Sequence, residues 1–286
     1  MTVIRLLSPA KINLFLHITG RQEDGYHSLQ TVFQLLDYGD DMTFSPAPAG
    51  TLAFHQAGSP KMGRMPAENN LVLRAARKLL AHAPNPPAGA TIHLHKRIPA
   101  GAGLGGGSSN AATTLVALNR LWDLQLDLDQ LAEIGLELVA DVPVFVRGKS
   151  AWAEGVGERL APLELPDATF VVITPACHVA TARVFSAENL TRNSASIKIA
   201  DFLAGRPCRN DCESVTRALY PEVDSLFRHL QKTGEVHMSG TGSSLFLRVA
   251  DQLSGERLLQ QLPDGCTGFV ARAINDLGWQ DKLAPV

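Results

Sequence analysis

The stretch "PAGAGLGGGSSNAA", residues 99–112, places closely spaced glycines in front of two serines and two alanines. Gly101, Gly103 and Gly106 satisfy the G-x-G-x-x-G pattern of dinucleotide-binding loops. The preceding segment, "ATIHLHKRIP", alternates as a strand does, and the following "NAATTLVALNRLWDL" has apolar residues at helical spacing. Such a loop can bind a dinucleotide, bind a nucleoside triphosphate or serve as a flexible linker.

Two of the common nucleotide motifs do not fit. A dinucleotide-binding unit needs an acidic residue at the end of the next strand, roughly 20 residues on. The acidic residues at that distance, Asp123, Asp127 and Asp129, lie in a helical or loop stretch. A Walker A loop needs Gly-Lys-Ser/Thr at the helix start, and these residues contain no lysine.

The composition of the loop favours an anion cradle over a linker. Glycines permit positive φ and close approach of the backbone, and the N-terminus of the helix offers free N–H groups and a positive dipole end. Ser108 and Ser109 add hydroxyls, while Ala111 and Ala112 keep the first turn slim. A flexible linker would seldom run straight into a helix with small residues in its first turn. The loop therefore predicts a polyphosphate site.

The bulk properties predict a globular protein with a local ligand site. The chain has 286 residues, 45% of them hydrophobic, and a net charge of −2 from 26 basic and 28 acidic side chains. This balance provides no global positive field for nucleic acid. No signal peptide and no run of roughly 20 apolar residues is present, so we expect no membrane association and a cytoplasmic protein. The four cysteines lack the partners of a zinc tetrad and are expected to be free thiols.

The order of predicted elements indicates an α+β protein of two domains. Residues 8–20 alternate as a strand, with Lys11 and Asn13 on one face and Ile12, Leu14, Leu16 and Ile18 turned to the core. Helical spacing follows in 66–83 and 129–148, the latter breaking near Asp141, and 150–163 reads as a hairpin. From about residue 160 the order is β-α-β-β-α-β, typical of a small sandwich. We expect an N-terminal domain over 1–160 and a C-terminal domain over 161–286.

The motifs together resemble one kinase superfamily. "PAGAGLGGGSSNAA" is similar to the phosphate loop of the galactokinase, homoserine kinase, mevalonate kinase and phosphomevalonate kinase (GHMP) superfamily. "SPAKINLFLHITGRQEDGYHSLQTVF" (8–33), "ADVPVFVRG" (140–148) and "SGTGSSLF" (239–246) agree with it, in family order. The lengthened loop, with Asn110 inserted, resembles the branch that phosphorylates a cytidine diphosphate-linked methylerythritol for isoprenoid synthesis outside the mevalonate route. The resemblance implies an N-terminal kinase domain, a C-terminal ferredoxin-like domain and a site between them.

The resemblance also implies the chemistry and two catalytic residues. ATP would be the donor and the tertiary 2-hydroxyl of the methylerythritol moiety the acceptor. Asp141 matches the family's catalytic aspartate and would accept the hydroxyl proton, although an Asp before Pro143 is also a normal helix N-cap. Lys11 would lie beside it and keep the carboxylate ionised, although lysine is usually a surface residue. Asn13, on the same face, would reach the same site.

Four positions are expected to bind the cytidine end of the substrate, and two further positions form a turn expected to close on the site. By resemblance, the Tyr26 ring stacks on cytosine and His27 hydrogen-bonds the base, although both could be ordinary turn residues. We expect His27, or a backbone group it positions, to read the edge where cytosine carries an amine and uracil a carbonyl. Further substrate-binding positions, for which core packing or a tight hairpin is the alternative, are Thr181, Phe185, Gly240 and Thr241, with Gly242 in the same turn.

The nucleotide site is expected to extend over the whole loop. Asn70 and Lys96 would border the adenine. Magnesium normally neutralises charge in phosphoryl transfer, but no ligand is assigned: Glu133 and Glu137 read as solvated helix residues, and Ser108 or Ser109 could contribute. The predicted ATP-binding set is Asn70, Lys96, Pro99, Ala100, Gly101, Ala102, Gly103, Leu104, Gly105, Gly106, Gly107, Ser108 and Ser109.

Two other functions compete with this interpretation. One is another kinase of the superfamily, acting on homoserine or mevalonate, against which the "DGYH" segment and the long loop argue. The other is a non-catalytic nucleotide-binding regulator, against which the presence of both Lys11 and Asp141 argues. The sequence leaves the oligomeric state open.

Overall fold

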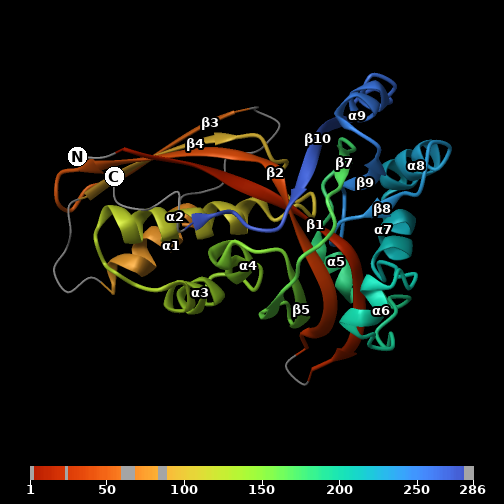
Figure 1. Ribbon diagram of the computed structural model, residues 1–286, viewed down its shortest axis with the longest axis horizontal. Coiled ribbons are helices and arrows are strands. Elements are labelled where there is room, and N and C mark those ends of the chain that lie inside the picture. The colour runs from red at the N-terminus through yellow and green to blue at the C-terminus, as the bar shows by residue number, and fades with distance from the viewer. Residues whose placement is uncertain (1–2, 23–24, 59–67, 83–88, 280–286) are drawn as a thin grey trace.

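Strand β2 is the spine of the molecule. The computed structural model describes residues 3–22, 25–58, 68–82 and 89–279. β2 (His27–Ala47) is paired antiparallel with β1 (Ile4–Arg21), β4 (Gly89–Lys96), β5 (Ala151–Gly155) and β10 (Thr267–Ile274). Because one long strand pairs with all four, the sheet continues from the N-terminal unit into the C-terminal unit (Figure 1).

The N-terminal unit packs helices against one face of its sheet. Helices α1 (Leu71–Leu80), α2 (Gly106–Leu121), α3 (Leu128–Leu136) and α4 (Val142–Arg147) lie on the same side of β1, β2 and β4 (Figure 1). Local caps set their starts: the Asn70 side chain accepts from the Val72 amide, and Asp127 and Gln130 form a capping box. The main core lies between these helices and the sheet.

Two pairings complete this unit at its edges. β3 (Leu52–Gly58) runs parallel to β4, and β5 forms an antiparallel hairpin with β6 (Arg159–Pro162). The hairpin over residues 150–163 confirms the prediction made from the sequence.

The C-terminal unit has the expected ferredoxin-like order. β7 (Thr169–Thr174), β8 (His237–Met238), β9 (Leu245–Val249) and β10 lie in the order β10-β7-β9-β8, with antiparallel neighbours. The helices of this unit are α5 (Thr181–Ser186), α6 (Ile199–Leu203), α7 (Glu213–Leu219), α8 (Pro221–Leu230) and α9 (Gln252–Leu259). The predicted α+β fold of two units is confirmed.

A shared core joins the two units directly behind the glycine loop. Ala102 and Leu104 of the loop pack with Ile12 of β1 and with Phe170 and Phe246 of the C-terminal sheet, and all five are buried. The loop is therefore anchored in the junction between the units. Since the chain also returns at its end to the first core, the division at residue 160 stays a prediction.

Three details differ from the sequence interpretation. β1 does not keep one apolar face: its register shifts between Asn13 and Leu16, so Ile12 packs in the junction core while Leu16 and Ile18 pack in the C-terminal core. Helix α2 begins at Gly106, inside the glycine run, four residues before the start expected from the apolar spacing. The short helices α5 and α6 and strand β3 were not predicted, because each is too short to show a period.

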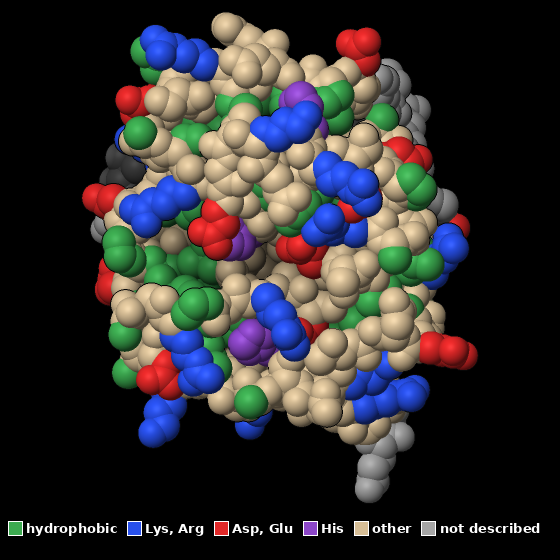
Figure 2. Space-filling view, turned by 90° about the vertical axis from the view of Figure 1, so that its right-hand side faces the viewer, with side chains coloured by type: hydrophobic (Ala, Val, Ile, Leu, Met, Phe, Trp, Pro, Cys, Tyr) green, Lys and Arg blue, Asp and Glu red, His purple; other side chains and the backbone are tan. Residues whose placement is uncertain are grey.

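The face formed by the C-terminal helices mixes both signs of charge. Figure 2 shows Lys and Arg side chains interspersed with Asp and Glu across this face, and hydrophobic side chains gathered around a hollow on one side. Basic side chains do not merge there into one continuous surface. Among the described residues, no helix is both long and apolar enough to cross a membrane.

Candidate active site

The glycine loop turns sharply three times before α2 begins. Gly101, Gly103 and Gly105 have φ values of 64°, 77° and 69°, in the left-handed region that favours glycine. The Ala102 carbonyl accepts from the Ser244 amide (3.1 Å), and the Leu104 carbonyl accepts from the Lys11 amide (3.0 Å). The loop is thus held in one conformation by β1 and by the C-terminal unit, with the N-terminus of α2 at its end.

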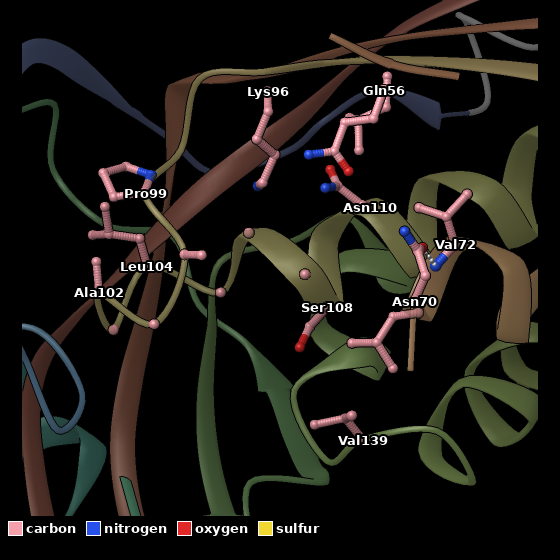
Figure 3. Close-up of a pocket in the computed structure, with 18 residues that line it drawn as sticks. Gln56, Asn70, Val72, Lys96, Pro99, Ala102, Leu104, Ser108, Asn110 and Val139 are labelled. Carbon is pink, nitrogen blue, oxygen red and sulfur yellow. Dashed lines mark hydrogen bonds between the residues drawn. The ribbon is translucent and has the colours of Figure 1, made fainter. Parts of the chain in front are cut away.

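A cavity of about 270 Å³ lies against this loop. Lys96 extends from β4 toward the start of α2, and the Ser108 hydroxyl points into the open space (Figure 3). Every predicted ATP-binding residue except Ser109 lines the cavity. Ser109 is fully buried, and its Oγ lies 2.8 Å from the Ser8 hydroxyl that donates to it, so its role is structural support of the loop.

The cavity also contains residues that sequence reasoning did not single out as ligand contacts. Asn110 accepts a 2.7 Å hydrogen bond from Ser8 Oγ, and its amide faces that of Gln56 (Figure 3). Leu71, Val72, Leu94 and Val139 supply apolar wall, a lining suited to a flat base. Asn70 both caps α1 and borders this wall. These contacts come from α1, α2, β3, β4 and the segment after α3, so spacing along the chain did not indicate them.

Lys96 is held by a buried carboxylate. Asp40 of β2 is fully buried, pairs with the Lys96 ammonium, and accepts from the backbone amides of Arg97 (2.6 Å) and Ile98 (2.7 Å). It thereby fixes both the end of β4 and the cation that faces the glycine loop. The sequence carries no signal for this role, because Asp40 lies 56 residues from Lys96.

Asp40→Asn is expected to destabilise the protein by about 1–3 kcal/mol. The amide oxygen still accepts from the two backbone amides, but the Lys96 ammonium loses its anionic partner in a buried position. Denaturant unfolding of both proteins measures the difference. Asp41→Asn, an exposed carboxylate next along the strand, is the matched control. Equal stability of the Asp40 variant and wild type would contradict this assignment.

Lys11 and Asp141 meet below the loop, as predicted. Lys11 is 3% exposed, and its Nζ donates to Asn13 Oδ1 (2.6 Å) and to the Gly103 carbonyl (3.0 Å). Asp141 Oδ2 lies 3.8 Å from the same Nζ. Burial lowers the pKa of Lys11, while the charge of Asp141 opposes that shift. These three partners compensate the burial of the ammonium, since lysine is almost never fully buried unless it is paired.

Asp141 does not use its side chain to cap helix α4. It occupies the N-cap position before Pro143, but its carboxylate makes no capping hydrogen bond. One third of the side chain is exposed, in contrast to its lysine partner. The preceding residues place it between two cavities: Val139 lines the cavity at the loop and Ala140 lines a second one. The carboxylate is therefore free to meet a ligand at the junction.

The second cavity, of about 520 Å³, is lined by four of the residues expected to bind the acceptor, Tyr26, His27, Thr181 and Phe185, whereas Asn13, Gly240 and Thr241 do not line it. Tyr26 is 66% exposed at its rim, and the His27 ring stacks on Phe185 with centroids 5.0 Å apart. Thr181 lines it too, and its Oγ1 lies 3.1 Å from Thr241 Oγ1. Residues of this cavity that were not among the predicted site residues are Arg21, Gly25, Leu29, Ala140, Val156, Ala182 and Ser186.

The turn at Gly240 and Thr241 closes against the glycine loop. A Cβ on Gly240 would lie 3.4 Å from Gly103 Cα, and Ser239 Oγ donates to the Gly103 carbonyl (2.8 Å). Asn210, which sequence reasoning missed, donates from Nδ2 to the carbonyls of Met238 (2.8 Å) and Gly240 (2.7 Å). The turn joins the paired strands β8 and β9 as a hairpin with its own backbone hydrogen bonds, and Asn210 and Ser239 fasten it to its surroundings.

The residues around the loop fit a magnesium ion bound mainly through phosphate. In the described part of the chain, no three His, Cys, Asp or Glu side chains gather as a metal site. Glu133 is exposed, and Glu137 is exposed and pairs with Lys78, away from both cavities. The Ser108 hydroxyl and the Asp141 carboxylate are oxygen ligands of the kind that magnesium prefers, and both face open space.

Comparisons with known proteins point to one family. The N-terminal domain model of the GHMP kinases matches residues 70–149, and the C-terminal model matches 190–267. A 4-diphosphocytidyl-2-C-methyl-D-erythritol kinase of Marinobacter nauticus is 51% identical over 99% of this chain and 98% of its own. A protein of the same name from Chromohalobacter salexigens is 48% identical over 100% of this chain and 98% of its own.

Solved structures of kinases are similar to this chain as well. A crystal structure of 4-(cytidine 5'-diphospho)-2C-methyl-D-erythritol kinase is 35% identical, with a TM-score of 0.83 over 94% of this chain and 99% of that one. The mevalonate kinase of Methanococcus jannaschii superposes with a TM-score of 0.70 over 96% of this chain and 98% of that one, at 16% identity. The second likeness concerns the fold alone.

Proposed function

The chain belongs to the 4-diphosphocytidyl-2-C-methyl-D-erythritol kinases of the GHMP family, and on that premise we propose how its residues perform the reaction. The enzyme transfers the γ-phosphoryl group of ATP to the 2-hydroxyl of 4-diphosphocytidyl-2-C-methyl-D-erythritol, a step of the non-mevalonate route to isoprenoid precursors. One observation carries the assignment of roles: the Lys11–Asp141 pair lies between the linings of the two cavities. Lys11 Nζ donates to the carbonyl of Gly103, which lines the first cavity, and Ala140, next to Asp141, lines the second.

Asp141 is the general base in this proposal. Its carboxylate accepts the proton of the 2-hydroxyl as that oxygen bonds to the γ-phosphorus, and the bond to the bridging β–γ oxygen breaks to release ADP. Lys11 pairs with the carboxylate and stabilises the negative charge that develops on the acceptor oxygen. Asn13 fixes the ammonium by accepting its 2.6 Å hydrogen bond.

The glycine loop and α2 bind the phosphates. The amides at the start of α2 and the Lys96 ammonium provide positive charge on two sides of the loop. The apolar wall around Val72 and Leu94 accepts the adenine, with the Asn70 side chain at its border. Magnesium, when bound, neutralises charge on the β- and γ-phosphates, and Ser108 and Asp141 are the residues that would help to hold it.

The second cavity binds the cytidine end of the acceptor. Tyr26 and the His27–Phe185 stack present flat aromatic surfaces, which suits a nucleobase. Thr181 and Thr241 connect this pocket to the turn that closes on the glycine loop. The methylerythritol hydroxyl would then lie on the side of Asp141.

Tyr26→Ala is expected to weaken cytidine and uridine acceptors about equally, by roughly 1–3 kcal/mol each. Stacking acts on the π face that every base has, so its loss does not change the preference between bases. Comparing kcat/KM for both analogues at saturating ATP measures this, and the KM for ATP should be unchanged. If kcat/KM of the variant equals that of wild type for both analogues, Tyr26 is only part of a turn.

The assignment of the acceptor is tested by offering alternatives. ADP release at saturating ATP should require 4-diphosphocytidyl-2-C-methyl-D-erythritol and should stay near background with homoserine or mevalonate. Faster turnover of homoserine or mevalonate would favour another kinase of the superfamily. ATP binding without turnover of any of the three would favour a nucleotide-binding regulator.

A further inference from the structure

We propose that Arg192 sets the base specificity of the second cavity by fixing the tautomer of His27, so that the imidazole donates from Nδ1 and selects cytidine over uridine. This inference rests on the proposed function, because it takes the cavity to be the site of the nucleobase. Arg192 does not line the cavity itself and acts through His27. It is therefore a positioning residue.

The guanidinium of Arg192 has no freedom left. Arginine carries five N–H donors in a planar fork. The Nε–H donates to His27 Nε2 (3.2 Å), and the four remaining donors reach backbone carbonyls at 2.7–3.5 Å, namely those of Phe185, Ala187, Glu188 and Leu190. The same residue thus holds the chain after α5 and presents one fixed donor to the imidazole.

A fixed donor determines where the imidazole carries its proton. A neutral imidazole has one N–H donor and one acceptor nitrogen, and Arg192 cannot accept a hydrogen bond. Nε2 must therefore be the acceptor, which leaves the proton on Nδ1. Burial lowers the pKa of His27, and the charges of Arg192 and Arg21 lower it further, so the ring stays neutral at physiological pH.

The ring is held in place while it presents this donor. It stacks on Phe185, whose own carbonyl is bound by Arg192. Among the described residues, Arg192 is the one hydrogen-bond partner of the His27 side chain. Nδ1–H is therefore the polar group that His27 offers to a ligand in the cavity.

An N–H donor distinguishes the two pyrimidines at N3. Cytosine N3 is an acceptor, whereas uracil N3 carries a hydrogen. Nδ1–H of His27 can bond the first and opposes the second, because two donors would face each other. The expectation was that His27, or a backbone group it positions, reads the exocyclic amine. The imidazole in this tautomer presents no acceptor for an amine, so that part of the expectation is left to the backbone group. A buried donor left unpaired costs roughly ten- to hundredfold in affinity.

The first experiment reads the tautomer directly. Long-range ¹⁵N–¹H correlation spectra of the full-length enzyme labelled in its nine histidines report which nitrogen is protonated, and His27→Asn assigns the signal. We expect protonation at Nδ1 in wild type. In Arg192→Met the imidazole can exchange between its two neutral tautomers, and the spectrum should show a mixture of both. A wild-type proton on Nε2 would overturn the inference while leaving the proposed function intact.

The second experiment measures binding with the ATP site filled by a non-hydrolysable ATP analogue. Wild type should bind cytidine diphosphate roughly ten- to hundredfold more tightly than uridine diphosphate. Arg192→Met should bring that ratio close to one. Arg192→Lys keeps a donor for His27 but cannot bind all four carbonyls, so both ligands should weaken with the ratio retained. Arg183→Met, an exposed arginine of α5, is the control for lost charge and should match wild type.

The outcomes separate the inference from the function. If Arg192→Met weakens both nucleotides equally, the residue only holds the chain after α5 and the inference is wrong. If Arg192→Met does not fold, the wild-type tautomer and the ratio in Arg192→Lys still decide. If wild type binds neither nucleotide with the ATP site filled, the cavity is not the cytidine site, and the proposed function fails together with the inference.

Discussion

We expect Asp141→Asn to lower kcat by roughly 10²–10⁴-fold, the usual cost of losing a well-placed general base. Asparagine has the same shape but cannot accept the proton of the 2-hydroxyl. The Asp141 carboxylate makes no capping hydrogen bond, is one third exposed and lies 3.8 Å from Lys11 Nζ, which keeps Asn13 and the Gly103 carbonyl as acceptors. In contrast to Asp40, its replacement should therefore leave the fold and the binding of both substrates nearly unchanged. Steady-state kinetics and calorimetric binding of ATP measure the two parts of this expectation.

Asp127→Asn provides the matched control. Asp127 is the N-cap of the neighbouring helix α3, where its side chain accepts from the Gln130 amide. Asparagine also caps helices, and the Asp127 side chain bonds its own helix whereas Asp141 pairs with Lys11, so the kcat of Asp127→Asn should equal that of wild type. A kcat near the wild-type value in Asp141→Asn would show that this carboxylate is only part of a helix start.

Gly105→Val is expected to raise the Kd for ATP by at least about thirtyfold. Gly105 has φ +69°, and a Cβ there would lie 2.7 Å from the Phe145 ring and 3.2 Å from Lys11 Cε. Backbone strain costs about 1–3 kcal/mol and overpacking about as much again, so the loop must leave its conformation. Calorimetry with ATP measures the loss.

Gly106→Val should weaken ATP binding through a steric clash of the new side chain rather than through backbone strain. Gly106 is the first residue of α2 and does not have positive φ, so the strain expected at Gly105 is absent there. Its Cβ would instead lie 2.9 Å from Ile98 Cγ2 and 3.0 Å from Lys96 Nζ, which displaces the cation at the cavity. Gly20→Val, where a Cβ has open space in a strand, is the control. Unchanged ATP affinity in both loop variants would contradict the assignment of the glycine loop as the site that binds the phosphates.

Local patterns predicted the parts of the site that lie close together in the sequence. The pattern of residues within short segments predicts the glycine loop, the helix after it and the order β-α-β-β-α-β. The structure confirms all three. Resemblance added the pairing of Lys11 with Asp141, 130 residues apart, which no local pattern contains. Helix α2 starts earlier than the apolar spacing predicts, because glycine is a poor helix former and the glycine run carries no apolar period.

The supporting residues could not be predicted, because each acts on a group far away in the chain. Asp40 holds Lys96, Asn210 holds the turn at Gly240, and Arg192 holds His27, at separations of 56, 30 and 165 residues. An Asp, Asn or Arg in a polar stretch has no distinguishing pattern of its own. Only the folded chain shows that the carboxylate is buried, that the amide bridges two carbonyls and that the guanidinium faces an imidazole.

Phosphorus NMR of the reaction product tests the central claim most directly. ATP and 4-diphosphocytidyl-2-C-methyl-D-erythritol are incubated with wild type and with Asp141→Asn, and the coupling pattern of the new phosphoester is recorded. We predict one new phosphomonoester on the tertiary 2-hydroxyl, without the coupling to a carbinol hydrogen that a primary or secondary ester shows, and almost none with the variant. A phosphoester on another hydroxyl, or equal product from both proteins, would contradict the account.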